Sequence, residues 1–154
     1  MEPSRGEVMS SVLIDACGWV ALVDARLNLD VAMASVAGSP RLLVLDSVNA
    51  ELQKLSQTRG GLLLDLLEQK SERMSDIEGI KHTDDMLVEL SIESGWPVLT
   101  VDRRLKERLV SSGGSYIEVT SGPSLRLVGR INGVERVSIT HPQYDLIDLH
   151  KLCI

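Results

Sequence analysis

Short apolar runs alternate with helical patterns along residues 12–120, and this alternation limits the fold more than any other feature of the sequence. The runs at 12–15, 41–46, 98–102 and 116–119 are typical of buried strands. Apolar residues recur at helical spacing between them, over 16–27, 29–37, the segment after Ser47, 62–72, 83–93 and 103–112. Strands that alternate with helices form a parallel sheet, so the sequence predicts an α/β fold with helices flanking the sheet.

The C-terminal part follows a different pattern. Residues 125–129 and 134–139 alternate between apolar and polar side chains, and the Ile-Asn-Gly sequence at 131–133 is typical of a turn between two strands. We therefore expect a β-hairpin extension over 124–140. The expected organisation is a flexible N-terminal segment at 1–11, an α/β domain at 12–120 and a C-terminal extension at 121–154.

Local signals also predict where helices begin. Ser47 and Thr83 each precede a helical pattern, and their hydroxyl groups are suited to cap its first turn. Residues 76–80 carry only a weak strand signal and are expected to form a weak strand or a loop.

Composition narrows the classes of function. Aromatic residues make up 3% of the chain and Phe is absent, so the core must consist of Leu, Val, Ile, Ala and Met. This scarcity argues against an aromatic platform that stacks nucleobases. The formal net charge of −6 disfavours a simple nucleic-acid-binding module, which is usually basic. A local basic patch, or metal ions held by carboxylates, can still bring an acidic chain to a phosphate backbone.

The two cysteines, Cys17 and Cys153, lie far apart and have no metal-binding spacing, which favours reduced thiols in an intracellular protein. No apolar run approaches the roughly 20 residues of a membrane helix. Residues 1–11 lack the hydrophobic stretch of a secretion signal. We expect a cytoplasmic protein that does not associate with a membrane.

Four carboxylates could meet at one rim of the predicted sheet. Asp15 and Asp102 end two predicted strands, and the carboxyl ends of parallel strands line the usual ligand crevice. Glu51 lies one helical turn after the second strand, and Asp84 begins the helix before Asp102. Each acid also has an ordinary explanation, because Asp15 and Asp102 could cap helices and Glu51 could be a solvated helix residue.

A metal ion is the natural partner of such a set. Four carboxylates repel one another, and the sequence supplies no matching set of buried Arg or Lys. Hard divalent ions such as Mg²⁺ and Mn²⁺ prefer oxygen ligands and offset this repulsion. Metal sites of this kind are suited to the hydrolysis of phosphate esters.

Four blocks of the sequence resemble the sequential motifs of PIN domains, and the resemblance spans roughly residues 10–120. The matching blocks are VLIDACGWV at 12–20, LDSVNAELQKL at 45–55, TDDMLVEL at 83–90 and PVLTVDRRLKERL at 97–109. The pattern is most similar to archaeal and eukaryotic PIN proteins of small-subunit ribosomal RNA processing, with VapC-type toxins next. The resemblance implies a PIN-like parallel sheet related to that of flap endonucleases.

The same resemblance implies a site. Its catalytic, metal-ligating acids are Asp15, Glu51, Asp84 and Asp102, which would bind Mg²⁺ or Mn²⁺. Thr100 matches a family threonine that supports the site by hydrogen bonding. Asp84 is preferred to its neighbour Asp85 because it lies 18 residues before Asp102, the usual family spacing. Asp85 is a further candidate ligand.

The implied activity is that of a metal-dependent endoribonuclease that leaves a 5′-phosphate and a 3′-hydroxyl. Arg103 and Arg104, in the densest basic cluster, would contact RNA, although they could also be the solvated face of a helix. Pre-ribosomal particles are the implied partners. The alternatives are a VapC-type toxin with an antitoxin partner and a non-catalytic PIN scaffold or RNA-binding module. The hairpin at 124–140 could extend a homodimer interface.

Cys17 departs from the family pattern, which often has Ser, Thr or Asn at this position. A thiol is a poorer hydrogen-bond partner than a hydroxyl, so the sequence leaves the support of Asp15 open. We expect Cys17 to be a buried and unreactive cysteine.

Overall fold

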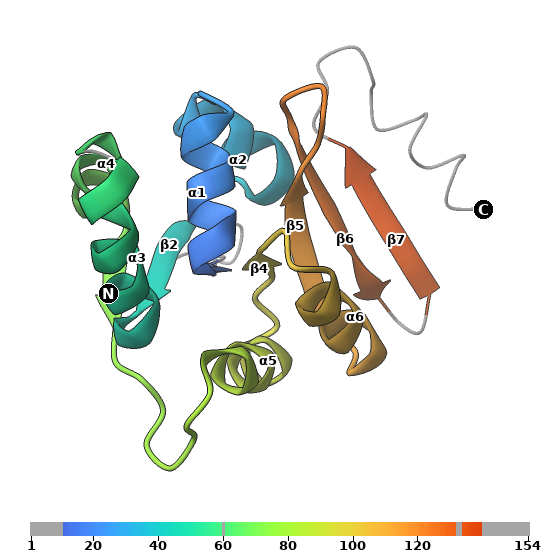
Figure 1. Ribbon diagram of the computed structural model, residues 1–154. Coiled ribbons are helices and arrows are strands. Elements are labelled where there is room, and N and C mark those ends of the chain that lie inside the picture. The colour runs from blue at the N-terminus through green and yellow to red at the C-terminus, as the bar shows by residue number, and fades with distance from the viewer. Residues whose placement is uncertain (1–10, 60, 132–133, 140–154) are drawn as a thin grey trace, which may run out of the picture.

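The structure is a computed structural model that describes residues 11–59, 61–131 and 134–139. In this part of the chain, one seven-stranded sheet carries helices on both faces (Figure 1). The strands are β1 (Ser11–Ile14), β2 (Arg41–Leu45), β3 (Glu72–Met74), β4 (Val98–Leu99), β5 (Ser115–Val119), β6 (Leu125–Ile131) and β7 (Val134–Ile139). The helices are α1 (Ala16–Asp24), α2 (Leu29–Ala37), α3 (Asp46–Arg59), α4 (Leu62–Lys70), α5 (Thr83–Ser94) and α6 (Arg103–Ser111).

The strands lie in the order β3-β2-β1-β4-β5-β6-β7. The strands from β3 to β5 are parallel, whereas β6 and β7 pair in antiparallel fashion as an extension of the same sheet. Strand β1 is central to the parallel part, where Leu13 is in register with Leu43 of β2 and with Val98 of β4. The predicted α/β class, with a C-terminal hairpin, is confirmed.

The helices form two layers because the order in which successive strands are placed across the sheet reverses on either side of β1. The connections from β1 through β2 to β3 run one way across the sheet, and those from β3 through β4 to β5 run the other way. Crossovers between parallel strands are right-handed, so the two sets of helices cover opposite faces. Helix α1 contacts α3 and α4, while α5 contacts α6, and Figure 1 shows these groups apart. The direction changes between β1 and β4, and in open parallel sheets ligands bind at the carboxyl ends of the strands at such a point.

The core is aliphatic, as the composition predicts, and every residue of β1 is buried. Among the described residues, the one large ring that is fully buried in this core is that of Trp19 on α1. Its indole Nε1 donates a hydrogen bond to the carbonyl oxygen of Leu63 at 3.0 Å, so α1 and α4 are joined by a satisfied polar contact inside the core.

Strand β3 differs from the prediction. It comprises Glu72–Met74, whereas Glu72 was expected to end a helix, no element was predicted at 73 and 74, and a weak strand or loop was expected at 76–80. Residues 76–80 form a loop. Within the described part of the chain, β3 lies at the edge of the sheet and pairs only with β2, so it lacks the apolar run of a buried strand.

Some predictions fall outside the described residues. These are the turn at Asn132 and Gly133, most of the N-terminal segment at 1–11, and the tail after residue 139 that contains Cys153. None of the helices that the structure describes is long and apolar enough to cross a lipid bilayer.

Close packing between α1 and β4 gives a test of the fold at Gly18. A Cβ atom at this position would lie 2.6 Å from Cδ2 of Leu99 and would also overlap the Leu99 carbonyl group. We expect Gly18→Ala to lower the free energy of unfolding by about 1–3 kcal/mol, measured by urea denaturation. The control is Gly122→Ala, where a Cβ meets nothing within 4 Å. Equal stability of the two variants would contradict this packing.

Candidate metal centre

Asp15 follows β1 directly and caps α1, and its residue is only 8% exposed. Its Oδ1 accepts a hydrogen bond from the Ala16 backbone N–H at 2.8 Å. Its Oδ2 accepts from the hydroxyl of Thr100 at 3.1 Å and from the thiol of Cys17 at 3.2 Å. Three donors therefore fix the orientation of this carboxylate.

Thr100 joins the carboxyl ends of β1 and β4. Its side chain is fully buried, and its hydroxyl donates to Asp15 and accepts from the backbone N–H of Asp102 at 3.1 Å. One hydroxyl group thus sets the position of two candidate ligands that lie 87 residues apart in sequence. The predicted supporting role of Thr100 has a direct geometric basis.

Asp102 is the N-cap of α6. Its Oδ1 accepts hydrogen bonds from the backbone N–H groups of Arg104, at 2.9 Å, and Leu105, at 3.3 Å. The ordinary capping explanation therefore holds for both Asp15 and Asp102. Capping does not exclude a second role, because Oδ2 of Asp102 accepts no hydrogen bond from any described residue.

Glu51 on α3 and Asp84 on α5 come from opposite layers. The predicted caps of these helices are wrong, because α3 already begins at Asp46 and the N-cap of α5 is His82. The two hydroxyls instead bond to each other across the layers. Thr83 Oγ1 donates to Ser47 Oγ at 2.9 Å, while the Ser47 backbone N–H donates to Asp76 Oδ1 at 3.0 Å. These contacts join the first turns of the helices that carry Glu51 and Asp84.

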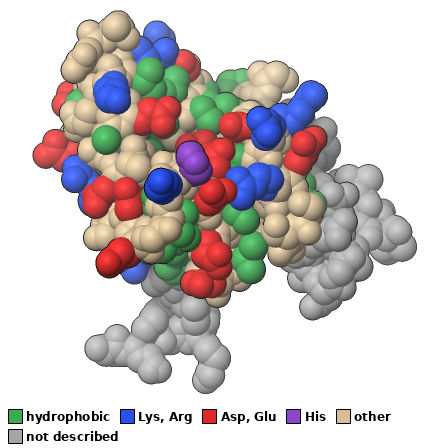
Figure 2. All heavy atoms as spheres, turned by 60° about the horizontal axis from the view of Figure 1, so that its bottom comes forward, with side chains coloured by type: hydrophobic (Ala, Val, Ile, Leu, Met, Phe, Trp, Pro, Cys, Tyr) green, Lys and Arg blue, Asp and Glu red, His purple; other side chains and the backbone are tan. Residues whose placement is uncertain are grey.

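The carboxylates of Glu51 and Asp84 respond to the charges of the other candidate acids. Glu51 is exposed, yet partial desolvation of its carboxylate, followed by the charges of Asp15 and Asp84, raises its pKa. Burial raises the pKa of Asp84, and the charges of Asp15 and Asp102 raise it further. Figure 2 brings this end of the molecule forward and shows acidic side chains gathered there, with basic side chains beside them. The structure thus brings Asp84 within electrostatic reach of Asp15, Glu51 and Asp102, and Glu51 within reach of Asp15.

Asp85 has a partner of its own. Its Oδ1 forms an ion pair with Nη2 of Arg108 on α6 at 2.7 Å, and both side chains are about half exposed. A carboxylate already neutralised by an arginine is a weaker candidate ligand than Asp84. This contact favours the choice of Asp84.

The donor set of Asp15, Glu51, Asp84 and Asp102 consists only of carboxylate oxygens, which fit hard divalent ions such as Mg²⁺ and Mn²⁺. Among the residues described, no three His, Cys, Asp or Glu side chains stand in an arrangement that could already hold a metal ion. The four acids are therefore near one another without being closed around a common point.

Cys17 supports Asp15, which the sequence left open. The half-buried thiol lies within hydrogen-bond distance of Asp15 Oδ2 and 3.4 Å from Thr100 Oγ1. Burial raises the pKa of the thiol most, and the Asp15 charge raises it further, against the opposing hydrogen bond with Thr100. The protonated thiol can therefore donate to Asp15, in place of a hydroxyl.

Glu118 on β5 is a buried acid that the sequence did not reveal. Lys106 Nζ on α6 donates to its Oε1 at 2.6 Å, and the guanidinium of Arg126 on β6 contacts its Oε2. Burial alone would raise the pKa of Glu118, but these two cations lower it. The ion pair with Lys106 joins α6 to the sheet.

Arg103 and Arg104, at the start of α6, are exposed.

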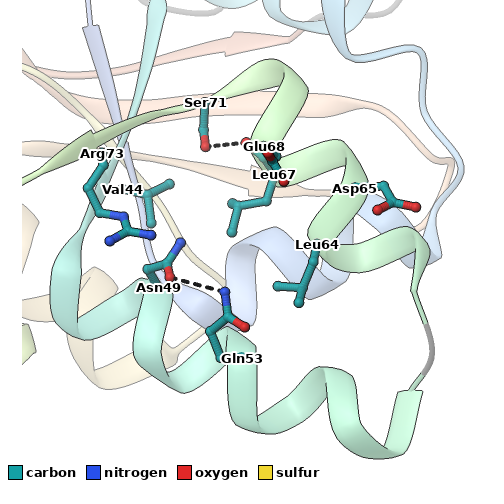
Figure 3. Close-up of a pocket in the computed structure, with 9 residues that line it drawn as sticks. All are labelled: Val44, Asn49, Gln53, Leu64, Asp65, Leu67, Glu68, Ser71 and Arg73. Carbon is teal, nitrogen blue, oxygen red and sulfur yellow. Dashed lines mark hydrogen bonds between the residues drawn. The ribbon is translucent and has the colours of Figure 1, made fainter.

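Two hollows lie near these elements. One, of about 590 Å³, lies at the β3 edge of the sheet between α3 and α4, where Asn49, Gln53, Leu64 and Arg73 are among its lining residues (Figure 3). None of the four acids lines it. The other, of about 620 Å³, lies between α6 and β5, and its lining includes Val101, Arg103, Lys106, Val110, Ser111 and Tyr116.

The fold is similar to that of a solved structure, the PIN domain endonuclease Utp24. The two superpose with a TM-score of 0.64 and 23% sequence identity, over 76% of this chain and 90% of the other. No model of a known protein family matches the sequence, and no curated protein matches it. At this level of identity the likeness establishes the fold, so the chain has a PIN-type fold.

The Thr100 bridge can be tested without metal or substrate. Valine has the shape of threonine but no hydroxyl, so Thr100→Val removes a donor from Asp15 and leaves the Asp102 N–H without its acceptor. We expect the free energy of unfolding to fall by about 1–3 kcal/mol in urea denaturation with EDTA.

Thr58→Val is the matched control, because the Thr58 hydroxyl donates to the Leu55 carbonyl on an exposed helix end. Its effect should stay within about 0.5 kcal/mol. If Thr100→Val were as stable as this control, the hydroxyl would not bridge the two strands.

Proposed function

We propose that the chain is a metal-dependent endoribonuclease that hydrolyses RNA phosphodiester bonds with Mg²⁺ or Mn²⁺. The observation that carries this proposal is that Asp84 interacts electrostatically with Asp15, Glu51 and Asp102, four acids that come from separate elements. Similarity to a PIN domain endonuclease supports the same activity.

The four acids would hold the ion, with Asp85 as a further candidate. When bound, the ion would lower the pKa of a water molecule and offset the charge that develops on the phosphate. The supporting residues keep the ligands in place: Thr100 and Cys17 orient Asp15, and the first turn of α6 orients Asp102. Such fixed ligands lower the cost of reorganisation when substrate binds.

Arg103 and Arg104 are proposed to contact RNA. Both are exposed, and they follow Asp102 directly, so their guanidinium groups can reach phosphates next to the cleaved bond. Local cations are needed at this site, because the chain as a whole carries a formal charge of −6.

The proposed substrate class is ribosomal precursor RNA, which rests on the similarity of the sequence blocks to PIN proteins of small-subunit ribosomal RNA processing. Co-sedimentation with pre-ribosomal particles would support it. A VapC-type toxin would instead arrest growth on expression and bind an antitoxin. A non-catalytic scaffold would bind no Mn²⁺ tightly.

Substitution of Asp15 tests the activity. Asparagine also caps helices, so Asp15→Asn should fold while losing a charged ligand. We expect Mn²⁺-dependent cleavage of RNA to fall by about 100-fold or more, the scale of losing one transition-state contact. The products of the unaltered protein should carry 5′-phosphate and 3′-hydroxyl ends, identified by mass spectrometry.

The control is Asp65→Asn, which removes the same charge from an exposed position on α4 and should retain activity. Full Mn²⁺-dependent cleavage by Asp15→Asn would show that the catalytic assignment is wrong.

A further inference from the structure

The hollow between α6 and β5, named here the α6–β5 groove, lies beside Asp102, although none of the four candidate acids lines it. Val101 and Arg103 both line it, and these residues flank Asp102 on either side. Ser111, at the other end of α6, also lines it. Ser111 lies eight positions after Arg103 on the helix, which corresponds to a rise of about 12 Å. The groove therefore leads away from the metal centre along α6.

The two cations that line the groove, Arg103 and Lys106, differ in whether they already have an ionic partner. Lys106 is fixed, because its Nζ lies 2.6 Å from Glu118 Oε1 and 5.4 Å from the centroid of the Tyr116 ring. Glu118 is shared between Lys106 and Arg126, which leaves one formal positive charge on these three side chains, and the exposed carboxylate of Glu107, which also lines the groove, offsets that charge. Arg103 is exposed and forms no ion pair with a described residue. Its guanidinium is therefore the charge that can meet an anion at the start of the groove.

One wall of the groove is apolar. Val101 follows a buried strand, yet the residue is 40% exposed. Val110 and Tyr116, which also line the groove, are half-buried. An apolar wall beside a cation suits a nucleotide, whose base is flat and largely apolar on its faces and whose phosphate is an anion. A volume of about 620 Å³ is within the range of small-molecule sites.

We propose that the α6–β5 groove holds the nucleotide of single-stranded RNA next to the phosphate at the metal centre. Arg103 contacts the phosphate of this nucleotide, and the base lies against Val101, Val110 and Tyr116. A base can reach this wall only when it is unstacked from its neighbours, which requires a single-stranded segment. This inference rests on the proposed endoribonuclease function and adds the path of the substrate.

Salt dependence of binding tests the Arg103 contact. The probe is a fluorescein-labelled single-stranded oligoribonucleotide of mixed sequence, followed by fluorescence anisotropy in EDTA at several salt concentrations. We expect Arg103→Ala to weaken binding roughly tenfold. The slope of log Kd against log salt should fall by about 0.7, the contribution of one phosphate contact in a single strand.

The control is Arg26→Ala, which removes the same charge from the connection between α1 and α2. Helix α1 starts at the carboxyl end of the sheet, so its own C-terminus, and Arg26 beyond it, lie at the opposite rim. This variant should keep the slope of the unaltered protein.

A matched pair of serines tests the far end of the groove. Ser111 and Ser112 are adjacent and exposed at the end of α6, but only Ser111 lines the groove. Both Ser111→Glu and Ser112→Glu place a negative charge at the same helix terminus, so any cost to folding is shared. We expect Ser111→Glu to weaken RNA binding about fivefold through like-charge repulsion, and Ser112→Glu to leave it nearly unchanged.

Weaker RNA binding by Arg103→Ala and Ser111→Glu than by their controls would support the proposed groove. If the unaltered protein cleaves RNA with Mn²⁺ but these variants bind RNA like their controls, the groove is wrong and the proposed function stands. If the unaltered protein neither binds nor cleaves RNA, both are wrong.

Discussion

The hydrogen bond from the Thr100 hydroxyl to Asp15 is the contact on which the candidate site depends. Strands β1 and β4 are neighbours at the point where the chain changes direction, and each ends one residue before this pair. The same hydroxyl accepts the N–H of Asp102, so the starts of α1 and α6 are set by one buried group. One buried hydroxyl therefore contacts the first residues of two helices that cover opposite faces of the sheet, and it holds Asp15 and Asp102 at neighbouring strand ends.

The site is held together at a cost to stability. Burial and neighbouring charges raise the pKa values of Glu51 and Asp84, which means that their ionised forms are disfavoured in the folded protein. Side chains selected only for folding would avoid this arrangement. Clusters of perturbed acids are characteristic of functional sites, where a cation or a reacting group offsets the repulsion. The Ser47–Thr83 contact and the ion pairs of Glu118 hold the surrounding helices against this repulsion.

The parts of the structure that could be predicted are those determined by local pattern. Apolar runs located β1, β2 and β5, and the acid after each of β1 and β4 followed from the geometry of a parallel sheet. Strand β3 was missed because a three-residue edge strand has no apolar run to reveal it. The contacts of Glu118 with Lys106 and of Ser47 with Thr83 were missed because each joins residues from different elements, and spacing in the sequence does not indicate which polar side chains meet.

Titration of Mn²⁺ by isothermal calorimetry tests the central claim most directly, because it requires neither an RNA substrate nor an assumption about the reaction. The unaltered protein should show saturable binding of Mn²⁺, and the Glu51→Gln/Asp84→Asn double variant should bind at least about tenfold more weakly. Circular dichroism would establish that the variant is folded. Saturable binding of equal strength in both proteins, or no binding in the unaltered protein, would contradict the assignment of these acids as a metal centre.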